Sequence, residues 1–227
     1  MPYAHRFADN RPLPLPLPLP VGKVVCVGRN YADHARELNN PVPDAPLLFI
    51  KPATAIVALE QPLQLPDFGG PCHFEGELAV LIGRQLTRAR TEETLAAVAG
   101  YGLGLDLTLR QLQDSLKQKG HPWELAKAFD GSCPLSPFVD PSQLDDVENC
   151  RYELWLNGAR QQRGETRHML TKVSALLAYC SRFFTLMPGD VVLTGTPAGV
   201  GVLQPGDRLQ LTLERCLDLS TCVASTA

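Results

Sequence analysis

Seven short apolar stretches, rich in β-branched residues and bounded by turn-forming residues, restrict the folds that this chain can adopt. Stretches of this length and composition are typical of strands. Four patterns predict helices, but they are too few and too irregularly spaced for a doubly wound fold. We therefore expect an α+β domain built on a mixed sheet. The expected strands are Lys23–Val27, Leu47–Ile50, Glu75–Ile82, Leu103–Leu107, Arg151–Leu156, Val191–Thr194 and Arg208–Leu213, and the expected helices are Tyr31–Leu38, Glu92–Ala99, Leu109–Lys117 and Lys172–Phe183.

Local signals refine this picture at the ends of the elements. Asn30, Thr91, Thr108 and Thr171 precede the expected helices and are predicted N-caps, because their side chains can accept from the first helical N–H groups. Asn157–Gly158 separates an apolar alternating run from a polar one and predicts a β-hairpin.

A proline-rich segment precedes the expected domain. Leucine and proline alternate from Pro12 to Pro20, and proline has no backbone N–H to donate. We therefore expect residues 1–22 to be an extended, polyproline-type lead-in, with a docking ligand for a proline-reading domain as the alternative. The middle of the 227-residue chain shows no linker, so residues 23–227 are expected to form one catalytic domain.

The charge and cysteine content argue against several functional classes. A formal net charge of −3 and the absence of a basic stripe argue against a general affinity for nucleic acid. Seven cysteines, without the spacing of a zinc knuckle or a redox motif, are expected to be free thiols. The N-terminus has no continuous apolar run after a basic start, so we expect neither a signal peptide nor a membrane span and place the protein in the cytoplasm.

Two glutamates interrupt one of the expected strands. Glu75 and Glu77 flank Gly76, and side chains two apart in a strand project to the same side, about 7 Å apart. Two carboxylates on one face repel in an apolar interior unless a cation neutralises them. Hard oxygen ligands of this kind suit Mg²⁺, Mn²⁺ or Ca²⁺.

A third carboxylate, Asp106, is the only charge in the apolar run Gly102–Leu107. Left unpaired in such a place, it would cost several kcal/mol. From the spacing alone, a structural role without a metal stays open for these three carboxylates. In that reading Glu75 and Glu77 line a solvated sheet face, while Asp106 ends a strand and caps the next helix.

Several separate blocks of the sequence occur in the order of a known family. In these blocks the chain resembles the fumarylacetoacetate hydrolase family, especially its single-domain acylpyruvate hydrolase and oxaloacetate decarboxylase branch. The resemblance covers nearly the whole span from Lys23 to Glu214. Gln111 departs from it, because close relatives often carry Asp there. The matching blocks are Val27–His34, Leu48–Pro52, Glu75–Val80, Asp106–Thr108, Pro122–Trp123, Ala126–Asp130 and Leu193–Gly201.

The resemblance implies a mixed β-sheet roll, a homodimer and one bound Mg²⁺ or Mn²⁺, with Ca²⁺ as a substitute. The implied metal ligands are Glu75, Glu77 and Asp106. His34 and Glu37 are three apart on an expected helix and so share a face, which suits a base and its orienting partner, although an incidental exposed histidine has the same spacing. In the family this helix acts as a lid, and the pair matches a water-activating dyad.

Further roles rest on the resemblance alone. Lys127 matches a catalytic lysine whose ammonium group approaches the bound acid. The substrate-binding residues that it implies are Arg29, Lys51, Arg110, Gln113 and Thr196.

The expected activity follows from this shared site. We expect a hydrolase that cleaves the C–C bond of a small acylpyruvate, of the fumarylpyruvate or acetylpyruvate type, through a metal-stabilised pyruvate enolate. Oxaloacetate decarboxylation, keto-enol tautomerisation and 2-hydroxyhepta-2,4-diene-1,7-dioate isomerisation use the same machinery and stay open. A metal-dependent 2-oxo acid binding protein is the non-enzymatic alternative.

Overall fold

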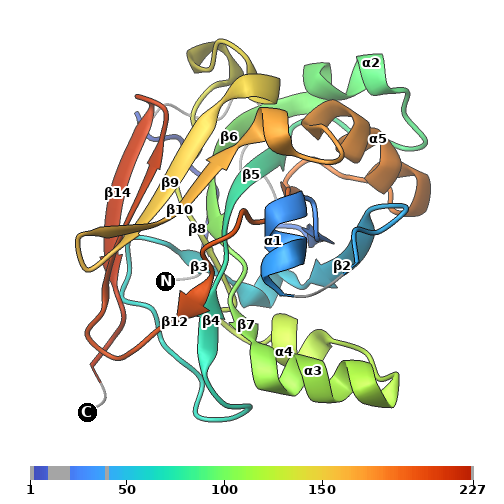
Figure 1. The fold of residues 1–227 in the computed structure, drawn as a ribbon. Helices are drawn as coiled ribbons and strands as arrows, with labels where there is room; N and C mark the ends of the chain where they lie inside the picture. The colour runs from blue at the N-terminus through green and yellow to red at the C-terminus, as the bar shows by residue number, and fades with distance from the viewer. Residues whose placement is uncertain (1–2, 10–20, 39–40, 226–227) are drawn as a thin grey trace.

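A mixed seven-stranded sheet forms the centre of the molecule. The structure, a computed structural model, describes residues 3–9, 21–38 and 41–225 (Figure 1). Within the sheet, β1 pairs in parallel with β11 and β3 with β8, whereas the other neighbours are antiparallel. The strands, in spatial order, are β2 (Leu47–Lys51), β1 (Val24–Gly28), β11 (Val191–Leu193), β5 (Gly76–Ile82), β6 (Val98–Leu105), β8 (Cys133–Leu135) and β3 (Ile56–Ala58).

Among the described residues, two smaller antiparallel sheets and five α-helices complete the fold. In Figure 1 the four-stranded sheet stands at the left, and α1, α3 and α4 lie on the other side of the molecule. The α+β prediction is confirmed. The four-stranded sheet has the order β10 (Ala159–Glu165), β9 (Arg151–Leu156), β13 (Arg208–Leu213) and β14 (Leu217–Cys222), and the three-stranded sheet has the order β12 (Gly201–Val202), β4 (Cys72–Phe74) and β7 (Thr108–Leu109). The helices are α1 (Ala32–Glu37), α2 (Thr91–Thr94), α3 (Arg110–Lys119), α4 (Glu124–Lys127) and α5 (Val173–Phe183), with 3₁₀ turns at Ala53–Ala55, Leu95–Ala97, Pro141–Gln143, Val147–Asn149 and Thr166–His168.

Strand β5 is buried on both faces, which explains its nearly continuous apolar sequence. Leu78, Val80 and Ile82 point into the larger of two apolar clusters, and Ala79 and Leu81 point into the smaller one on the opposite side. A strand held on both faces is a rigid base for the carboxylates at its start.

The N-terminal residues pack onto this domain. Phe7 is buried and forms a bridge with Phe138, and the His5 ring lies 2.9 Å from the carbonyl oxygen of Gly189. Residues 3–9 therefore contribute to the core. The predicted polyproline stretch Pro12–Pro20 lies outside the described residues.

The prediction of a helix from Glu92 to Ala99 was wrong beyond its first turn. The α-helix ends at Thr94, a 3₁₀ turn follows, and the chain continues from Val98 as β6. Residues 98–105 pair along β5, and these long-range hydrogen bonds outweigh the local helical pattern.

The four predicted N-caps were also wrong, each by one residue. Lys172, for example, is the N-cap of α5. The first backbone N–H groups of this helix donate to a residue that is distant in the sequence. The Glu148 carboxylate accepts from the backbone N–H groups of Val173 and Ser174 at 3.0 and 2.9 Å. The Asn30 side chain instead accepts from Thr171 N–H, so it ties two loops together. The Asn157–Gly158 hairpin is confirmed: both residues have positive φ and join β9 to β10.

All seven cysteines are free, as predicted. In the described part of the chain, no helix has the length and apolar character needed to cross a membrane.

Candidate metal centre and substrate cavity

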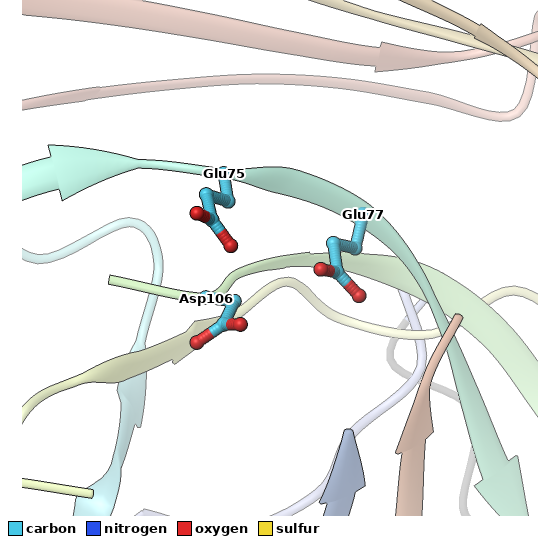
Figure 2. A group of neighbouring side chains, drawn as sticks. All are labelled: Glu75, Glu77 and Asp106. Carbon is cyan, nitrogen blue, oxygen red and sulfur yellow. The ribbon is translucent and has the colours of Figure 1, made fainter. Parts of the chain in front are cut away.

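Two paired strands bring three carboxylates together. Glu75 lies directly before β5 and Glu77 lies within it, so their side chains leave the backbone on the same side. Asp106 follows β6, the antiparallel partner of β5, and its N–H donates to the Glu75 carbonyl at 2.8 Å. One carboxylate oxygen from each residue lies within 4.8 Å of the others, and all three residues are buried (Figure 2). The structure thus brings together the three predicted metal ligands.

Gly76 has a structural role between the two glutamates. Its N–H donates to the Gln162 side-chain oxygen at 2.8 Å, and a Cβ at this position would approach Gln162 and Leu154 to 3.0 Å. Gln162 also donates to the Thr196 hydroxyl at 2.7 Å. The close contact on the face opposite the carboxylates explains why a residue without a side chain occurs there.

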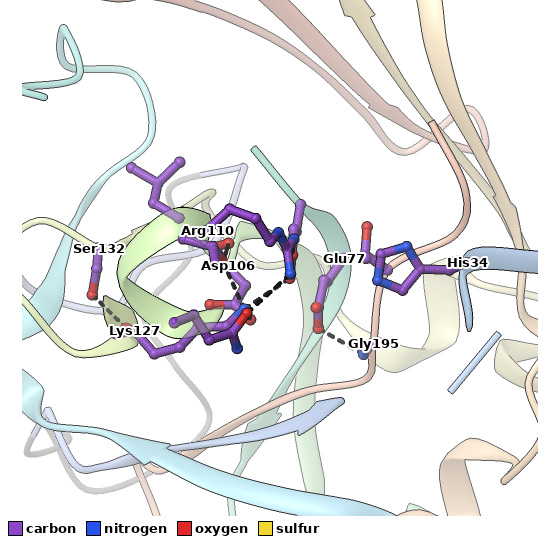
Figure 3. Close-up of polar contacts among 12 residues, drawn as sticks. His34, Glu77, Asp106, Arg110, Lys127, Ser132 and Gly195 are labelled. Carbon is purple, nitrogen blue, oxygen red and sulfur yellow. Dashed lines mark hydrogen bonds and ion pairs between the residues drawn. The ribbon is translucent and has the colours of Figure 1, made fainter. Parts of the chain in front are cut away.

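Lys127 bridges two members of the triad. Its buried Nζ lies 2.9 Å from Glu75 Oε2 and 2.6 Å from Asp106 Oδ2, and it also donates to the Thr108 hydroxyl at 2.6 Å (Figure 3). Arg110 pairs with the other oxygen of Glu75. Burial alone would lower the pKa of Lys127, but Asp106 and Glu75 raise it above its usual range. The ammonium group therefore stays charged at neutral pH.

Glu77 has a different environment from the other two carboxylates. Its Oε2 accepts from the Gly195 N–H at 2.6 Å, and among the described residues no cationic side chain pairs with it. Burial, followed by repulsion from Asp106 and Glu75, holds the pKa of Glu77 well above its usual range. For Glu75, burial raises the pKa, but Lys127 and Arg110 outweigh it and bring the pKa below its usual range.

The donor set fits a hard divalent cation. All three donors are carboxylates, and Glu77 lacks a positive partner among the described side chains. Asp106 Oδ1 forms an ion pair with Lys51 Nζ at 2.9 Å but has no hydrogen bond. Mg²⁺ and Mn²⁺ prefer oxygen ligands of this kind, whereas zinc sites more often use histidine and cysteine. A cation between the three carboxylates would remove the repulsion that raises the pKa of Glu77.

His34 and Glu37 form a hydrogen-bonded pair on helix α1. His34 Nδ1 lies 3.3 Å from Glu37 Oε2, and the other Glu37 oxygen accepts from the Gly199 N–H at 3.0 Å. A carboxylate can only accept, so Nδ1 must carry a proton, which leaves Nε2 as the acceptor of the neutral ring. Burial lowers the pKa of His34 in spite of the opposing effects of Glu75 and Glu37, so the ring is neutral at pH 7.

A cavity of about 40 Å³ lies in front of the triad. Glu37 and Lys51 do not line it, although all other predicted site residues do. The predicted site residues on its wall are Arg29, His34, Glu75, Glu77, Asp106, Arg110, Gln113, Lys127 and Thr196.

Lys51 was predicted to bind substrate, but it does not lie on the cavity wall. It is fully buried, with Nζ beside Asp106 Oδ1 and the carbonyl oxygen of Lys127. It supports the triad from the core side and does not reach the space in front of it. Gln111, the departure from the family pattern, is exposed and is also absent from the cavity wall.

Two predicted substrate-binding residues are already engaged by neighbours. Gln113 accepts from Arg110 at 3.0 Å. The Thr196 hydroxyl donates to the Gly76 carbonyl at 3.0 Å and accepts from Gln162. Contact between these two residues and a substrate stays a prediction.

Among the cavity residues that the sequence reasoning missed are Lys117, Phe49 and Trp123. A signal for Lys117 was present, because Arg110, Gln113 and Lys117 follow the i, i+3, i+7 spacing of one helix face. The ring centroids of Phe49 and Trp123 are 6.1 Å apart, and both rings also line an adjacent apolar groove of about 420 Å³.

Comparisons with known proteins identify relatives of this chain. Oxaloacetate tautomerase YcgM from Escherichia coli (strain K12) is 53% identical over 195 residues, which cover 86% of this chain and 89% of that protein. Mitochondrial oxaloacetate tautomerase FAHD1 from Bos taurus is 42% identical over 213 residues, covering 93% of this chain and 96% of that protein.

A solved structure extends the comparison to the fold. The fumarylpyruvate hydrolase from Pseudomonas aeruginosa, in complex with Mn²⁺ and pyruvate, has a TM-score of 0.90 and 36% identity, and the match covers 99% of this chain and 97% of that one. The family described as fumarylacetoacetate (FAA) hydrolase C-terminal matches residues 23–224. The chain belongs to the fumarylacetoacetate hydrolase family.

Proposed function

We propose that this protein is a metal-dependent oxaloacetate tautomerase, which interconverts the enol and keto forms of this 2-oxo acid. The observation that carries the proposal is a neutral histidine, oriented by a carboxylate, on the wall of a cavity that also contains three acidic side chains. Two relatives of 53% and 42% identity that bear the name of this activity support the choice of reaction.

The chemistry divides between the ion and the side chains. Mg²⁺ or Mn²⁺ held by Glu75, Glu77 and Asp106 would supply Lewis-acid stabilisation of negative charge on the oxo group of the acid. His34 Nε2 can carry the proton that moves between the oxygen and C3, because it is the free acceptor of the neutral ring. The charged Lys127 adds a second positive group beside the developing negative charge.

Helix α1 has a positioning role in this proposal. It contributes His34 to the cavity wall, and Glu37 fixes both the imidazole ring and, through Gly199, the helix itself. A helix of six residues is too short to be stable alone. Its place over the cavity therefore depends on these tertiary contacts, which suits a segment that must admit substrate.

Acylpyruvate hydrolysis is the second candidate, and one observation favours it. The His34–Glu37 pair is also suited to activating a water molecule, and the P. aeruginosa relative is a fumarylpyruvate hydrolase. Hydrolysis would begin with water attack at the acyl carbonyl and would release pyruvate as the leaving group. Decarboxylation of oxaloacetate and isomerisation of a dienedioate stay further alternatives of the same site.

One set of rates separates these activities. The purified protein is treated with chelator, divided, and assayed with and without added Mn²⁺ for ketonisation of enol-oxaloacetate, decarboxylation of oxaloacetate and hydrolysis of acetylpyruvate and fumarylpyruvate. We expect turnover only with metal, and the largest kcat/KM for ketonisation. A larger kcat/KM for an acylpyruvate than for enol-oxaloacetate would show that the protein is a hydrolase and contradict the tautomerase proposal. Binding of 2-oxo acids without any turnover would indicate the non-enzymatic alternative.

A further inference from the structure

Lys117 lies on the cavity wall at the outer end of the site. It is seven residues after Arg110 and four after Gln113 on helix α3, so the three side chains share one helix face, and all three line the cavity. Arg110 reaches the inner end and pairs with Glu75. Lys117 is farther along the helix, and its side chain is 27% exposed.

The surroundings of Lys117 hold its ammonium group without neutralising it. Nζ lies 5.4 Å from the centroid of the Trp123 ring, a cation–π contact that fixes the side chain against the cavity wall. The nearest carboxylate, Asp114, has Oδ1 at 3.5 Å and is 55% exposed, and an exposed pair of this kind contributes little. A stronger anionic ligand can therefore compete for the ammonium group.

Positive charge gathers around Lys117. Burial lowers the pKa of Lys117, and Arg110 and Arg29 lower it further, while Asp114 opposes them. Arg29 and Arg110 also line the cavity. We call Arg29 and Lys117 the basic rim.

Arg29 has an unusual backbone conformation, with φ of 60° at a residue other than glycine. Such conformations cost free energy and are found both in turns and at functional sites. At this position the conformation belongs to the loop between β1 and α1, which carries the Arg29 side chain to the cavity.

The cavity thus has different polar groups at its two ends. The inner end contains the three carboxylates that suit a divalent cation, and the outer end contains the basic rim. An acid with one carboxylate needs only the inner end. An acid with two carboxylates can contact both ends at once, because its second carboxylate can compete with the exposed Asp114 for the Lys117 ammonium group.

We propose that Lys117 binds the distal carboxylate of a 2-oxo dicarboxylic acid and so selects dicarboxylates over 2-oxo monocarboxylates. This proposal rests on the proposed function for the identity of the inner group, a 2-oxo acid. Trp123 is a positioning residue in it, because its ring holds the Lys117 ammonium group in place. A charge-assisted hydrogen bond between an ammonium group and a carboxylate contributes about 1.5–3 kcal/mol, which corresponds to about 10- to 100-fold in affinity.

Direct binding provides the test. The Kd values of difluoro-oxaloacetate, which has two carboxylates and no hydrogen on C3, and of pyruvate, which has one carboxylate, are measured by calorimetry with saturating Mn²⁺. We expect Lys117→Gln to raise the Kd of difluoro-oxaloacetate by about tenfold or more and the Kd of pyruvate by less than about twofold. The matched control is Lys119→Gln, which removes the same charge from an exposed position of the same helix outside the cavity wall.

Two further measurements make the test specific. Asp114→Asn removes the competing carboxylate, so we expect it to leave the affinity for difluoro-oxaloacetate unchanged or to strengthen it. For oxaloacetate turnover, Lys117→Gln should raise KM and leave kcat within about twofold, since the group binds the substrate away from the reacting atoms.

The outcomes separate this proposal from the proposed function. Equal losses for both ligands, or the same loss in Lys119→Gln, overturn the role of Lys117 even if the parent protein turns over oxaloacetate. The parent could have no activity on oxaloacetate while Lys117→Gln lowers the affinity for the dicarboxylate alone. That result would support the role of Lys117 and contradict the tautomerase proposal.

Discussion

Among single residues, Glu77 and Glu75 show how neighbours decide the state of a buried carboxylate. Both are buried and stand two residues apart, yet the pKa of Glu77 is raised and that of Glu75 is lowered. The difference lies in their partners. Lys127 and Arg110 pair with Glu75, whereas Glu77 accepts from the Gly195 N–H.

This contrast predicts the effect of Glu77→Gln. A carboxyl group whose pKa is raised by folding stabilises the protein below its unfolded-state pKa, about 4.3, and that stabilisation is lost as the pH rises toward the folded-state pKa. In the presence of chelator, the free energy of unfolding of the parent should therefore fall relative to Glu77→Gln as the pH rises above about 4.3. Denaturant titrations across this range measure the difference. The variant should also bind Mn²⁺ about tenfold more weakly or worse, because one of three carboxylates is lost.

Glu75→Gln is the matched comparison and should behave in the opposite way. The pKa of Glu75 is lowered, so its stabilisation is present above about pH 4.3 and is lost on acidification. Removing this charge leaves Lys127 and Arg110 with fewer partners and should destabilise the metal-free protein at pH 7. Parallel pH profiles of the parent and both variants would contradict the assigned charge states.

The His34–Glu37 pair predicts a pH dependence of activity. Burial lowers the pKa of His34, so kcat/KM should fall on acidification through a pKa below about 6.5. The hydrogen bond to Glu37 raises this pKa, and Glu37→Gln should therefore move the acid limb to still lower pH. His34→Ala should reduce kcat by about 10²-fold or more. Arg36→Gln, an exposed change on the same helix, serves as the control, and an acid limb that stays unmoved in Glu37→Gln would exclude the pairing.

At the scale of elements, the glycine-rich loop between β11 and β12 determines where helix α1 lies. Gly199 N–H donates to Glu37 at 3.0 Å, and Gly195 N–H donates to Glu77. Both glycines have positive φ, which other residues rarely adopt. The loop therefore connects helix α1 to the carboxylate triad through two backbone hydrogen bonds.

Gly199→Ala tests this connection. The substitution forces an unfavourable φ of 98°, and its Cβ would overlap with the carbonyl oxygen of Gln161 on β10. Gly206→Ala has a similar φ of 86° but no atom within 4 Å, so it measures the backbone strain alone, about 1–2 kcal/mol. We expect Gly199→Ala to lower the free energy of unfolding by about 1–3 kcal/mol more than Gly206→Ala does, as measured by denaturant titration, and to raise KM. Equal effects of the two substitutions would argue against a tight fit of the loop on β10.

At the scale of the whole molecule, a single compact unit carries the site. The family match covers residues 23–224, and residues 3–9 pack onto the same core. The site draws on α1, β5, the segment after β6, α3 and α4, which are distant in sequence. Loss of any one of these elements would therefore open the cavity.

The homodimer stays a prediction that rests on the family resemblance. Light scattering at micromolar concentration should give about twice the 24.8 kDa of one chain. A dilution series with the same detector checks whether the mass changes with concentration. A mass near 24.8 kDa throughout would contradict the dimer.

The sequence by itself determined the features that depend on local pattern. Apolar runs placed β1, β5 and β11, and alternation of side chains placed Glu75 and Glu77 on one side of a strand. The hairpin at Asn157–Gly158 followed from the φ values that its turn requires. These signals are reliable because a few neighbouring residues generate them.

Only the tertiary structure decided the features that depend on pairing between distant segments. Residues 98–105 became a strand because β5 supplies hydrogen-bond partners, and α5 begins at Val173 because Glu148 caps it. Lys51 faces Asp106 from the core, and Lys117 faces the cavity, because packing fixes the direction of each side chain. Such contacts join residues far apart in the chain, and local sequence patterns do not specify them.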